Sequence, residues 1–343
     1  MNHKVFSVAW RLAALAACIA AGVYAYRLAT GYYDPPALVG IVNPQEPVSY
    51  LDTADFTAAL SDLGCEVRTA DPTVPAEESV LQLIEQGAKV VVVGCDAPFT
   101  EEEVFSQASA HSTTLLFVGA APQQALLDGY DKAWALENDA AYGGQLLGKQ
   151  AALAFRDGTL ADADADQLMD CMGLLPGDYP SAGVVGREFL AESEHYGVYS
   201  DLHHNFTAVS SELAHSVNEL FLPGTESEDP LEDDTAGDAS DTAQPEVIFC
   251  AGSRAAQTAH ELSAQLGWQG TTRIAALAEN LQTAQSLRDN GIADYIAYYD
   301  EAAATNILAE FTRNALNKRF IAQGCELQPD ENKHFIFGYQ LLE

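Results

Sequence analysis

The sequence predicts an α/β protein made of two lobes, each built on a doubly wound parallel sheet. The chain has 343 residues, and because a domain averages about 150 residues, two hydrophobic cores are expected. Segments with strand and helix patterns alternate along the chain, as they do in parallel sheets covered by helices. The run KVVVV at 89–93 is apolar at every position after the lysine. Such a run is typical of a strand buried on both faces.

The first lobe is expected to begin with a strand at 37–42 and a helix at 53–63 that stops at Gly64. An extended segment at 65–69, a helix at 77–86 and the strand 89–93 follow. A helix at 100–110 and a strand at 114–118 complete this unit. The pair Asn138-Asp139 then provides an N-cap for a long helix at 140–155.

The second half of the chain continues the same alternation. We expect strands at 171–175, 196–202, 247–250, 273–277, 295–298 and 334–341, and helices at 181–194, 210–222, 253–265 and 302–317. Residues 224–244 combine dense acids with no aromatic side chain. This segment cannot bury enough apolar surface to stay ordered, so we interpret it as a disordered acidic insertion at the surface.

The charge of the chain limits its partners. There are 16 Lys and Arg against 50 Asp and Glu, a formal net charge of −34 at pH 7. Nucleic-acid phosphates require a basic surface, so a nucleic-acid partner is excluded. The charge fits a soluble surface that binds cations or neutral ligands. No nucleophile elbow, phosphate loop or HExxH pattern is present, and we do not expect an enzyme.

The first 33 residues are expected to export the chain and to tether it. Lys4 and Arg11 precede an apolar run at 12–26, which is short for a spanning helix of roughly 20 residues and has the form of a signal sequence. Residues 15–18, LAAC, match a lipoprotein cleavage box that would leave Cys18 acylated. The alternative is an uncleaved signal anchor, because the sequence after Cys18 stays apolar. Either interpretation places the body outside the cytoplasmic membrane.

The segment 128–150, DGYDKAWALENDAAYGGQLLGKQ, carries a family resemblance. It resembles the hinge segment of the bacterial galactose/glucose-binding proteins, a branch of the type I periplasmic binding proteins, and the likeness runs in order through most of 37–343. The resemblance implies two lobes joined by a hinge of three crossings. By this pattern the N-terminal lobe comprises 37–136 plus 300–325, and the C-terminal lobe 137–299 plus 326–343.

The resemblance also implies a ligand cleft between the lobes. Members of the family hold a sugar between aromatic rings and polar side chains. The matching positions here are Tyr50, Arg187, Ser253, Glu279 and Tyr299. At other matching positions a hydrogen-bonding side chain is lost or shortened: Val48, Gly94, Ser181 and Gly183. Each missing partner of a buried polar ligand costs about 1–3 kcal/mol, so tight galactose or glucose binding by the family's geometry is not expected.

The acidic loop DADADQLMD has the ligand order of a calcium loop. Asp162, Asp164 and Asp166 stand at positions 1, 3 and 5, the Leu168 carbonyl at 7 and Asp170 at 9. Two positions depart from that order: Gln167 replaces the expected glycine at 6, and Gly173 at 12 provides no carboxylate. The resemblance supplies a distant last ligand, because Glu246 in PEVIFCAGS stands where the family has its glutamate. We therefore expect a structural Ca²⁺.

The leading hypothesis is an extracytoplasmic solute-binding protein of an ABC importer. It would bind a monosaccharide or a similar small polar ligand in the cleft and deliver it to a permease by hinge closure. The alternative is a degenerate relative of the galactose-binding proteins that acts as a ligand sensor or scaffold without tight sugar binding.

Overall fold

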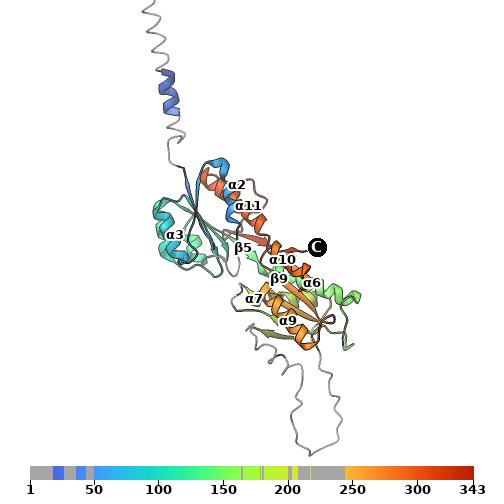
Figure 1. The fold of residues 1–343 in the computed structure, drawn as a ribbon. Helices are drawn as coiled ribbons and strands as arrows, with labels where there is room; N and C mark the ends of the chain where they lie inside the picture. The colour runs from blue at the N-terminus through green and yellow to red at the C-terminus, as the bar shows by residue number, and fades with distance from the viewer. Residues whose placement is uncertain are drawn as a thin grey trace, which may run out of the picture.

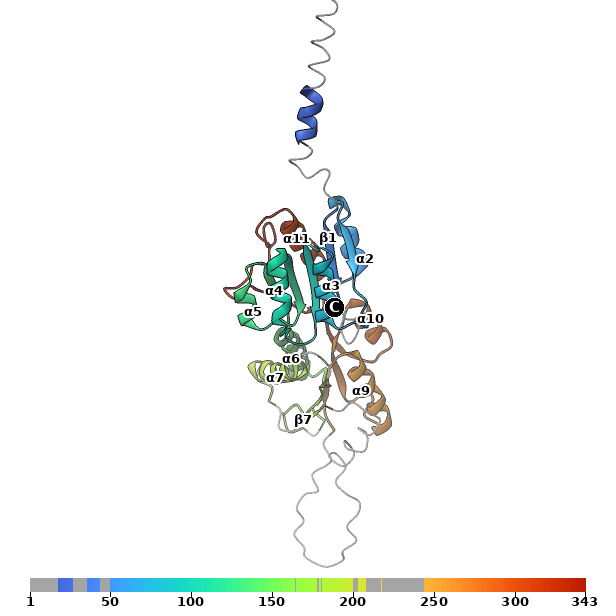
Figure 2. The same cartoon turned by 90° about the vertical axis from the view of Figure 1, so that its left-hand side faces the viewer.

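The computed structural model describes residues 18–26, 36–43, 50–163, 165–177, 179, 181–199, 203–207, 217 and 244–343. These residues form two lobes, one above the other in Figures 1 and 2, and each lobe is built on a six-stranded sheet flanked by helices. The predicted fold class, with two doubly wound parallel-sheet lobes, is confirmed.

The first sheet has the order β11-β5-β4-β3-β1-β2, and all of its neighbouring strands are parallel. Its strands are β1 (Leu38–Val42), β2 (Glu66–Thr69), β3 (Val90–Cys95), β4 (Thr114–Gly119), β5 (Ala133–Asp139) and β11 (His334–Gly338). The helices of this lobe are α2 (Thr53–Ala59), α3 (Ala76–Glu85), α4 (Glu102–His111), α5 (Gln124–Gly129) and α11 (Glu301–Leu316).

The second sheet has the order β12-β10-β9-β8-β6-β7. Its strands are β6 (Cys171–Leu174), β7 (His203–Phe206), β8 (Val247–Ala251), β9 (Arg273–Ala278), β10 (Tyr295–Tyr298) and β12 (Gln340–Leu341). Only β12 runs antiparallel to its neighbour in this described sheet. The helices are α6 (Ala140–Asp157), α7 (Ala182–His195), α9 (Ser253–Leu266) and α10 (Leu281–Asp289).

The valine run of β3 shows why the first sheet is central to its lobe. Val90 and Val92 belong to the core beneath α2 and α11, whereas Val91 and Val93 belong to the core beneath α3 and α4. All four are at most 1 % exposed. Successive side chains of a strand point to opposite faces, so a strand buried on both faces needs an apolar residue at every position. The prediction for 89–93 is confirmed.

The chain passes between the lobes three times. β5 leads into α6, β10 into α11, and β11 into β12. The stretch 334–341, expected as one strand, divides at Tyr339, so that β11 extends the first sheet and β12 the second. The boundary set by the sheets therefore differs from the expected one, which counted all of 326–343 with the second lobe. A single residue, Tyr339, makes the third crossing.

Other elements differ from expectation in ways that have local causes. Residues 196–199 are not a strand, because Gly197, with φ +79°, donates to the Glu194 carbonyl and ends α7; the strand lies at β7. The short α5 was not predicted, and neither was α10, which Asn280 caps by accepting a hydrogen bond from Thr283 N.

The acidic insertion 224–244 lies outside the described residues except for its last residue, as does almost all of 210–222.

Residues 18–26 are helical and exposed. Among the described residues, no helix has both the length and the apolar character needed to cross a membrane.

Candidate functional site

The candidate site is a cavity of about 360 Å³ between the lobes. From the first lobe it is lined by Asp96 after β3, Gly119 at the end of β4 and Asn138 in β5. Ser181, next to α7, and Tyr339, in the third crossing, complete this part of the lining. Ligands of parallel sheets bind beyond the carboxyl ends of the strands, where this cavity lies. Its volume falls in the range of about 300–1,000 Å³ typical of small-molecule sites.

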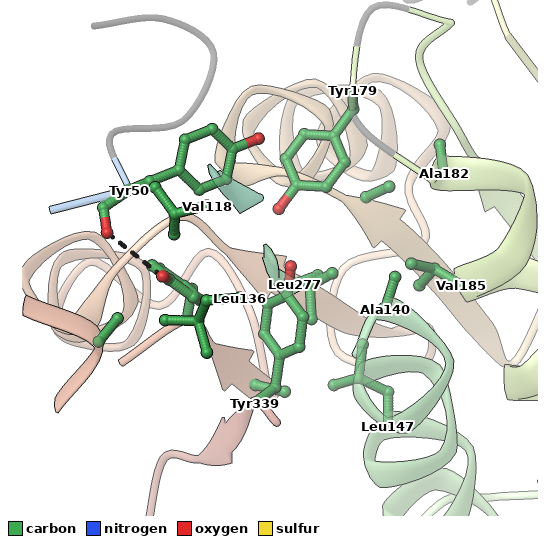
Figure 3. Close-up of a cluster of buried hydrophobic side chains, with 14 of the residues drawn as sticks. Tyr50, Val118, Leu136, Ala140, Leu147, Tyr179, Ala182, Val185, Leu277 and Tyr339 are labelled. Atoms are coloured by element: carbon green, nitrogen blue, oxygen red, sulfur yellow. Dashed lines mark hydrogen bonds between the residues drawn. The ribbon is translucent and has the colours of Figure 1, made fainter. Parts of the chain in front are cut away.

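Four tyrosines, Tyr50, Tyr179, Tyr299 and Tyr339, fill the space beside this cavity, and we call them the tyrosine cluster. Tyr50 follows β1, Tyr179 follows β6, Tyr299 follows β10, and Tyr339 lies between β11 and β12. Their exposed fractions are 1, 7, 0 and 6 %. Figure 3 shows the hydroxyls of Tyr50, Tyr179 and Tyr339 pointing toward a common space. The cluster therefore contains one residue from each lobe, Tyr50 and Tyr179, and one residue from each of two crossings, Tyr299 and Tyr339.

Hydrogen bonds and ring contacts hold the cluster together. The Tyr299 hydroxyl donates to the Tyr50 carbonyl at 3.2 Å (dashed in Figure 3), and the two rings meet edge to face with centroids 6.2 Å apart. The Tyr50 hydroxyl donates to Asp96 Oδ1 at 2.7 Å. The Tyr179 and Tyr339 hydroxyls lie close enough for each to influence the pKa of the other. Edge-to-face aromatic pairs contribute about 0.5–1.5 kcal/mol beyond their buried area.

Burial sets the ionisation of these groups. It raises the pKa of each of the four tyrosines above the ordinary value, and for Tyr50 the hydrogen bond to Asp96 raises it further. Burial also raises the pKa of the Asp96 carboxyl, while the hydrogen bond from Tyr50 opposes that shift. The phenols therefore remain neutral hydrogen-bonding groups at any physiological pH.

Two glycines let the rings approach the backbone. A Cβ on Gly119 would lie 2.5 Å from the Tyr50 ring, and a Cβ on Gly252 would lie 2.8 Å from the Tyr179 ring. Both glycines have positive φ, +98° and +96°, a conformation that costs other residues free energy. Glycine at these two strand ends is therefore part of how the tyrosine cluster is packed.

Acceptor oxygens surround the cluster. Glu279 Oε1 accepts hydrogen bonds from Ser253 N at 2.9 Å and Ser253 Oγ at 3.0 Å, and Glu279 contributes to the raised pKa of both Tyr179 and Tyr339. Glu279 Oε2 and Asn138 Oδ1 are buried and have no hydrogen-bond partner among the described residues. A buried acceptor without a partner costs free energy, which a ligand that donates hydrogen bonds would recover.

The structure brings four of the five expected ligand residues to the tyrosine cluster, and of these Tyr50 alone lines the cavity. Tyr50 and Tyr299 are in direct contact, and Ser253 and Glu279 form a pair beside Tyr179. Arg187 is not part of this group: its side chain is 68 % exposed, and its guanidinium forms an ion pair with Glu188 at 3.2 Å. Because Glu188 also accepts a hydrogen bond from Gln145 on α6, the pair lies on the side of α7 that faces α6.

Sequence reasoning missed several residues of the site. Tyr179 and Tyr339 complete the tyrosine cluster, and Asp96 and Asn138 supply acceptors to the cavity. Asp96 directly follows the buried β3, and Asn138 stands at the end of β5. A polar side chain at the carboxyl end of a buried parallel strand is a signal that could have found both. Tyr339 carries no such signal, because the division of 334–341 was not visible in the pattern.

The acidic loop folds around Glu246, which is 2 % exposed. Glu246 Oε1 accepts a hydrogen bond from Ala163 N at 3.1 Å, and Oε2 accepts one from Asp170 N at 2.6 Å. Burial raises the pKa of Glu246 to about 7, although these two backbone donors favour the charged form. The distant glutamate expected from the resemblance therefore does reach the loop, where it binds the backbone at both ends.

The turn has one backbone feature of a cation loop. Gln167 adopts φ +69°, the left-handed conformation expected at that position, and its N–H donates to Asp162 Oδ2 at 3.0 Å. Asp162 Oδ1 is buried and lacks a partner within the described chain, and Asp170 is 5 % exposed. Oxygen donors of this kind suit Ca²⁺. Among the described residues, however, no three His, Cys, Asp or Glu side chains gather closely enough to hold a metal ion, and Asp164 lies outside them.

Comparisons with known proteins identify the fold. No family model and no curated protein matches the sequence. Among solved structures, a substrate-binding protein of a sugar ABC transport system from Bordetella parapertussis matches with a TM-score of 0.61 and 10 % identity, over 90 % of each chain. A 5-methylthioribose transporter solute-binding protein from Thermotoga lettingae, in complex with 5-methylthioribose, gives a TM-score of 0.56 and 12 % identity, over 89 % of this chain and 85 % of that one.

A glucose-galactose binding protein from Geobacillus stearothermophilus gives a TM-score of 0.55 and 10 % identity, over 90 % of this chain and 98 % of that one. These identities show the fold and leave function to be argued from the site. The chain has the fold of the type I periplasmic binding proteins, as the resemblance at 128–150 predicted.

Proposed function

We propose that this chain is an extracytoplasmic solute-binding protein that holds a small polar ligand, of the size of a monosaccharide, between its lobes. The observation that carries the proposal is the cavity of about 360 Å³ beside the first and third crossings, lined by the rings of Tyr50 and Tyr339 and by the acceptor oxygens of Asp96 and Asn138. Aromatic faces and hydrogen-bonding groups are what a pyranose or furanose ring requires. The similar structures whose names specify sugar transport or sugar binding support the same function.

The first experiment measures thermal unfolding of the chain against a panel of hexoses, pentoses, thiosugars and aminosugars. A ligand at 100 times its dissociation constant should stabilise the fold by about 2.7 kcal/mol. Asp96→Asn should diminish the shift, because Asp96 lines the cavity and orients Tyr50. Asp55→Asn is the matched control, since Asp55 is an exposed residue of α2 in the same lobe. It should leave the ligand shift intact.

If none of the compounds shifts the unfolding temperature, the proposal is refuted. The alternative, a sensor or scaffold without tight sugar binding, would then explain why four of the chain's own tyrosines occupy the space between the lobes. An equal loss of the ligand shift in Asp96→Asn and Asp55→Asn would also count against the cavity as the binding site.

We also infer that the chain is held at the outer face of the cell membrane and delivers its ligand to an ABC permease. The basic N-terminus, the apolar run 12–26 and the LAAC box support this proposal. Cell fractionation of the Cys18→Ser variant separates the two modes of attachment. An acylated lipoprotein would be released or left unprocessed, whereas a signal anchor would remain in the membrane unchanged. A wild-type chain found in the soluble cytoplasmic fraction would refute the tether.

A structural Ca²⁺ in the loop at 162–170 is a further proposal. It is supported by the left-handed Gln167, by the buried Asp162 oxygen that has no partner among the described residues, and by the buried carboxyls of Asp170 and Glu246. Millimolar Ca²⁺ should raise the unfolding temperature, and a chelator should reverse the rise. Asp162→Asn should remove the Ca²⁺ response, while Asp289→Asn in α10 should not. An unfolding temperature that is indifferent to Ca²⁺ would reject the proposal.

A further inference from the structure

A second and larger cavity, of about 770 Å³, lies at the other end of the first sheet. Its lining includes Ala37 just before β1, Lys89 just before β3, Thr114 at the start of β4 and Trp134 at the start of β5. Phe320, which follows α11, also lines it. These are the amino ends of the strands, whereas the candidate ligand site lies at the carboxyl ends. The two cavities therefore serve different surfaces of the molecule.

Positive charge gathers around this cavity. Lys89, Lys132, Lys318 and Arg319 line it, in a chain that has only 16 Lys and Arg against 50 Asp and Glu. One carboxylate, that of Asp131, is also part of the lining. Within the described part of the chain, none of the four cations forms an ion pair. In so acidic a protein, four cations without a carboxylate partner on one face indicate an anionic partner.

Aromatic rings accompany the charge. The Phe320 side chain is 51 % exposed and meets the Trp134 ring edge to face, with centroids 5.8 Å apart. Phe320 directly follows Lys318 and Arg319, which are exposed as well. Exposed aromatic rings next to basic side chains are the combination found where proteins meet lipid headgroups. We call Lys89, Lys132, Lys318, Arg319, Trp134 and Phe320 the basic face.

The chain connects the basic face closely to the proposed tether. Ala37 lines the cavity, and ten residues, 27–36, separate it from the apolar run 12–26. Ten residues reach at most about 33–36 Å when fully extended. The start of β1 and the end of α11 lie at the same end of the molecule in both ribbon views (Figures 1 and 2). A tethered chain would therefore keep this face within reach of the bilayer.

We propose that the basic face binds the anionic phospholipid surface of the membrane to which the chain is tethered. The lysines and Arg319 contact headgroup phosphates, and Phe320 lies at the headgroup level. The many acids of the chain do not prevent this, because charges farther apart than about 8 Å are largely screened at physiological salt. Membrane contact at this face leaves the cavity between the lobes open to solvent. The proposal rests on the proposed tether, and not on the identity of the solute.

A chain without the tether can test the surface alone. Every buried core residue of the described chain lies at Leu38 or later, so residues 34–343 contain both sheets and their cores. We would measure sedimentation of this chain with vesicles of phosphatidylcholine, and with vesicles of equal parts phosphatidylcholine and phosphatidylglycerol. Trp134 offers a second readout, because its fluorescence should shift to shorter wavelength when lipid covers the ring.

We expect binding to the acidic vesicles and not to the neutral ones. Removing one Lys or Arg from a membrane surface weakens binding about fivefold, so Lys318→Gln with Arg319→Gln should weaken it about 25-fold. Both residues are exposed, and the variant should unfold at the wild-type temperature. The matched control is Arg156→Gln with Arg254→Gln, which removes two exposed cations from the second lobe and should change nothing.

Three results would overturn the proposal: no preference for acidic vesicles, equal binding by the double variant and the control, or competition by millimolar inorganic phosphate. The last result would identify a pocket for a small anion in place of a membrane surface. Because the assay contains neither tether nor solute, its outcome is independent of the sugar panel, and fractionation of Cys18→Ser reports separately on the tether.

Discussion

Gly252 decides how closely Tyr179 can pack between the lobes. The residue has φ +96°, and a Cβ there would lie 2.8 Å from the Tyr179 ring and 3.3 Å from Glu279 Oε1. Glycine is required at this position for two separate reasons, a backbone conformation and a lack of space. The two reasons can be distinguished, because other glycines of the chain have a positive φ but enough space around them for a Cβ.

We predict that Gly252→Ala lowers the free energy of unfolding by about 2–4 kcal/mol, combining a left-handed alanine with overpacking against Tyr179. Gly267→Ala is the control: Gly267 has φ +75°, and a Cβ added there would meet nothing within 4 Å. It should cost only about 1–2 kcal/mol, the conformational part. Urea unfolding of both variants measures the difference, and equal losses would show that ring packing at Gly252 contributes nothing.

At the residue scale, the sequence predicted which side chains lie at the site better than it predicted the contacts that they make. Tyr50 and Tyr299 could be anticipated from a family pattern, but their mutual hydrogen bond could not. The pairing of Arg187 with its neighbour Glu188 depends on how α7 packs against α6, which brings Gln145 to the other side of Glu188. Side-chain direction follows tertiary packing, and a single sequence does not display it.

At the scale of elements, two glycines of helix α6 let α7 lie directly against it within the second lobe. A Cβ on Gly144 would be 2.4 Å from the Val185 carbonyl oxygen, and a Cβ on Gly148 would be 2.2 Å from the Phe189 carbonyl oxygen. Ser193 on α7 closes the contact by donating to the Gly148 carbonyl at 3.2 Å. The obstacles are backbone atoms, which cannot rotate away.

Gly148→Ala should therefore separate the two helices. Alanine favours a helix by about 1 kcal/mol over glycine, but forcing apart a packed backbone contact costs about 1–3 kcal/mol or more, so we expect net destabilisation. Gly129→Ala in α5 is the control, because a Cβ there would have nothing within 4 Å. Thermal unfolding of the two variants provides the measurement. A Gly148→Ala protein as stable as the Gly129→Ala protein would contradict the packing argument.

Most elements could be predicted because their patterns are local. The boundaries of β3, β4, α6, α9 and β10 lie within a few residues of expectation, since each has an apolar run or a cap in its own sequence. The division of 334–341 into β11 and β12 could not be predicted. It depends on strands β5 and β10, which lie far away in the sequence and each pair with one half of the stretch.

At the scale of the whole molecule, the net charge of −34 acts against the compact state, because like charges repel in proportion to how tightly they are confined. We predict that the unfolding temperature rises as sodium chloride is increased from low to physiological ionic strength. Choline chloride at equal ionic strength should give the same rise, since screening does not depend on which cation is present. A fall in unfolding temperature over this range would show that attractive ion pairs outweigh the repulsion.

The tyrosine cluster limits the stability of the two-lobed molecule at alkaline pH, and phenolate absorbance can follow the loss of stability. An unfolded or opened chain exposes phenols with an ordinary pKa near 10, whereas burial raises the pKa of Tyr50, Tyr179, Tyr299 and Tyr339 in the closed form. Their contribution to stability is complete below pH 10 and is lost as the pH rises further, because only the separated lobes can release these protons. Phenolate absorbance should consequently appear in two stages, with the exposed tyrosines first and the cluster only when the lobes part.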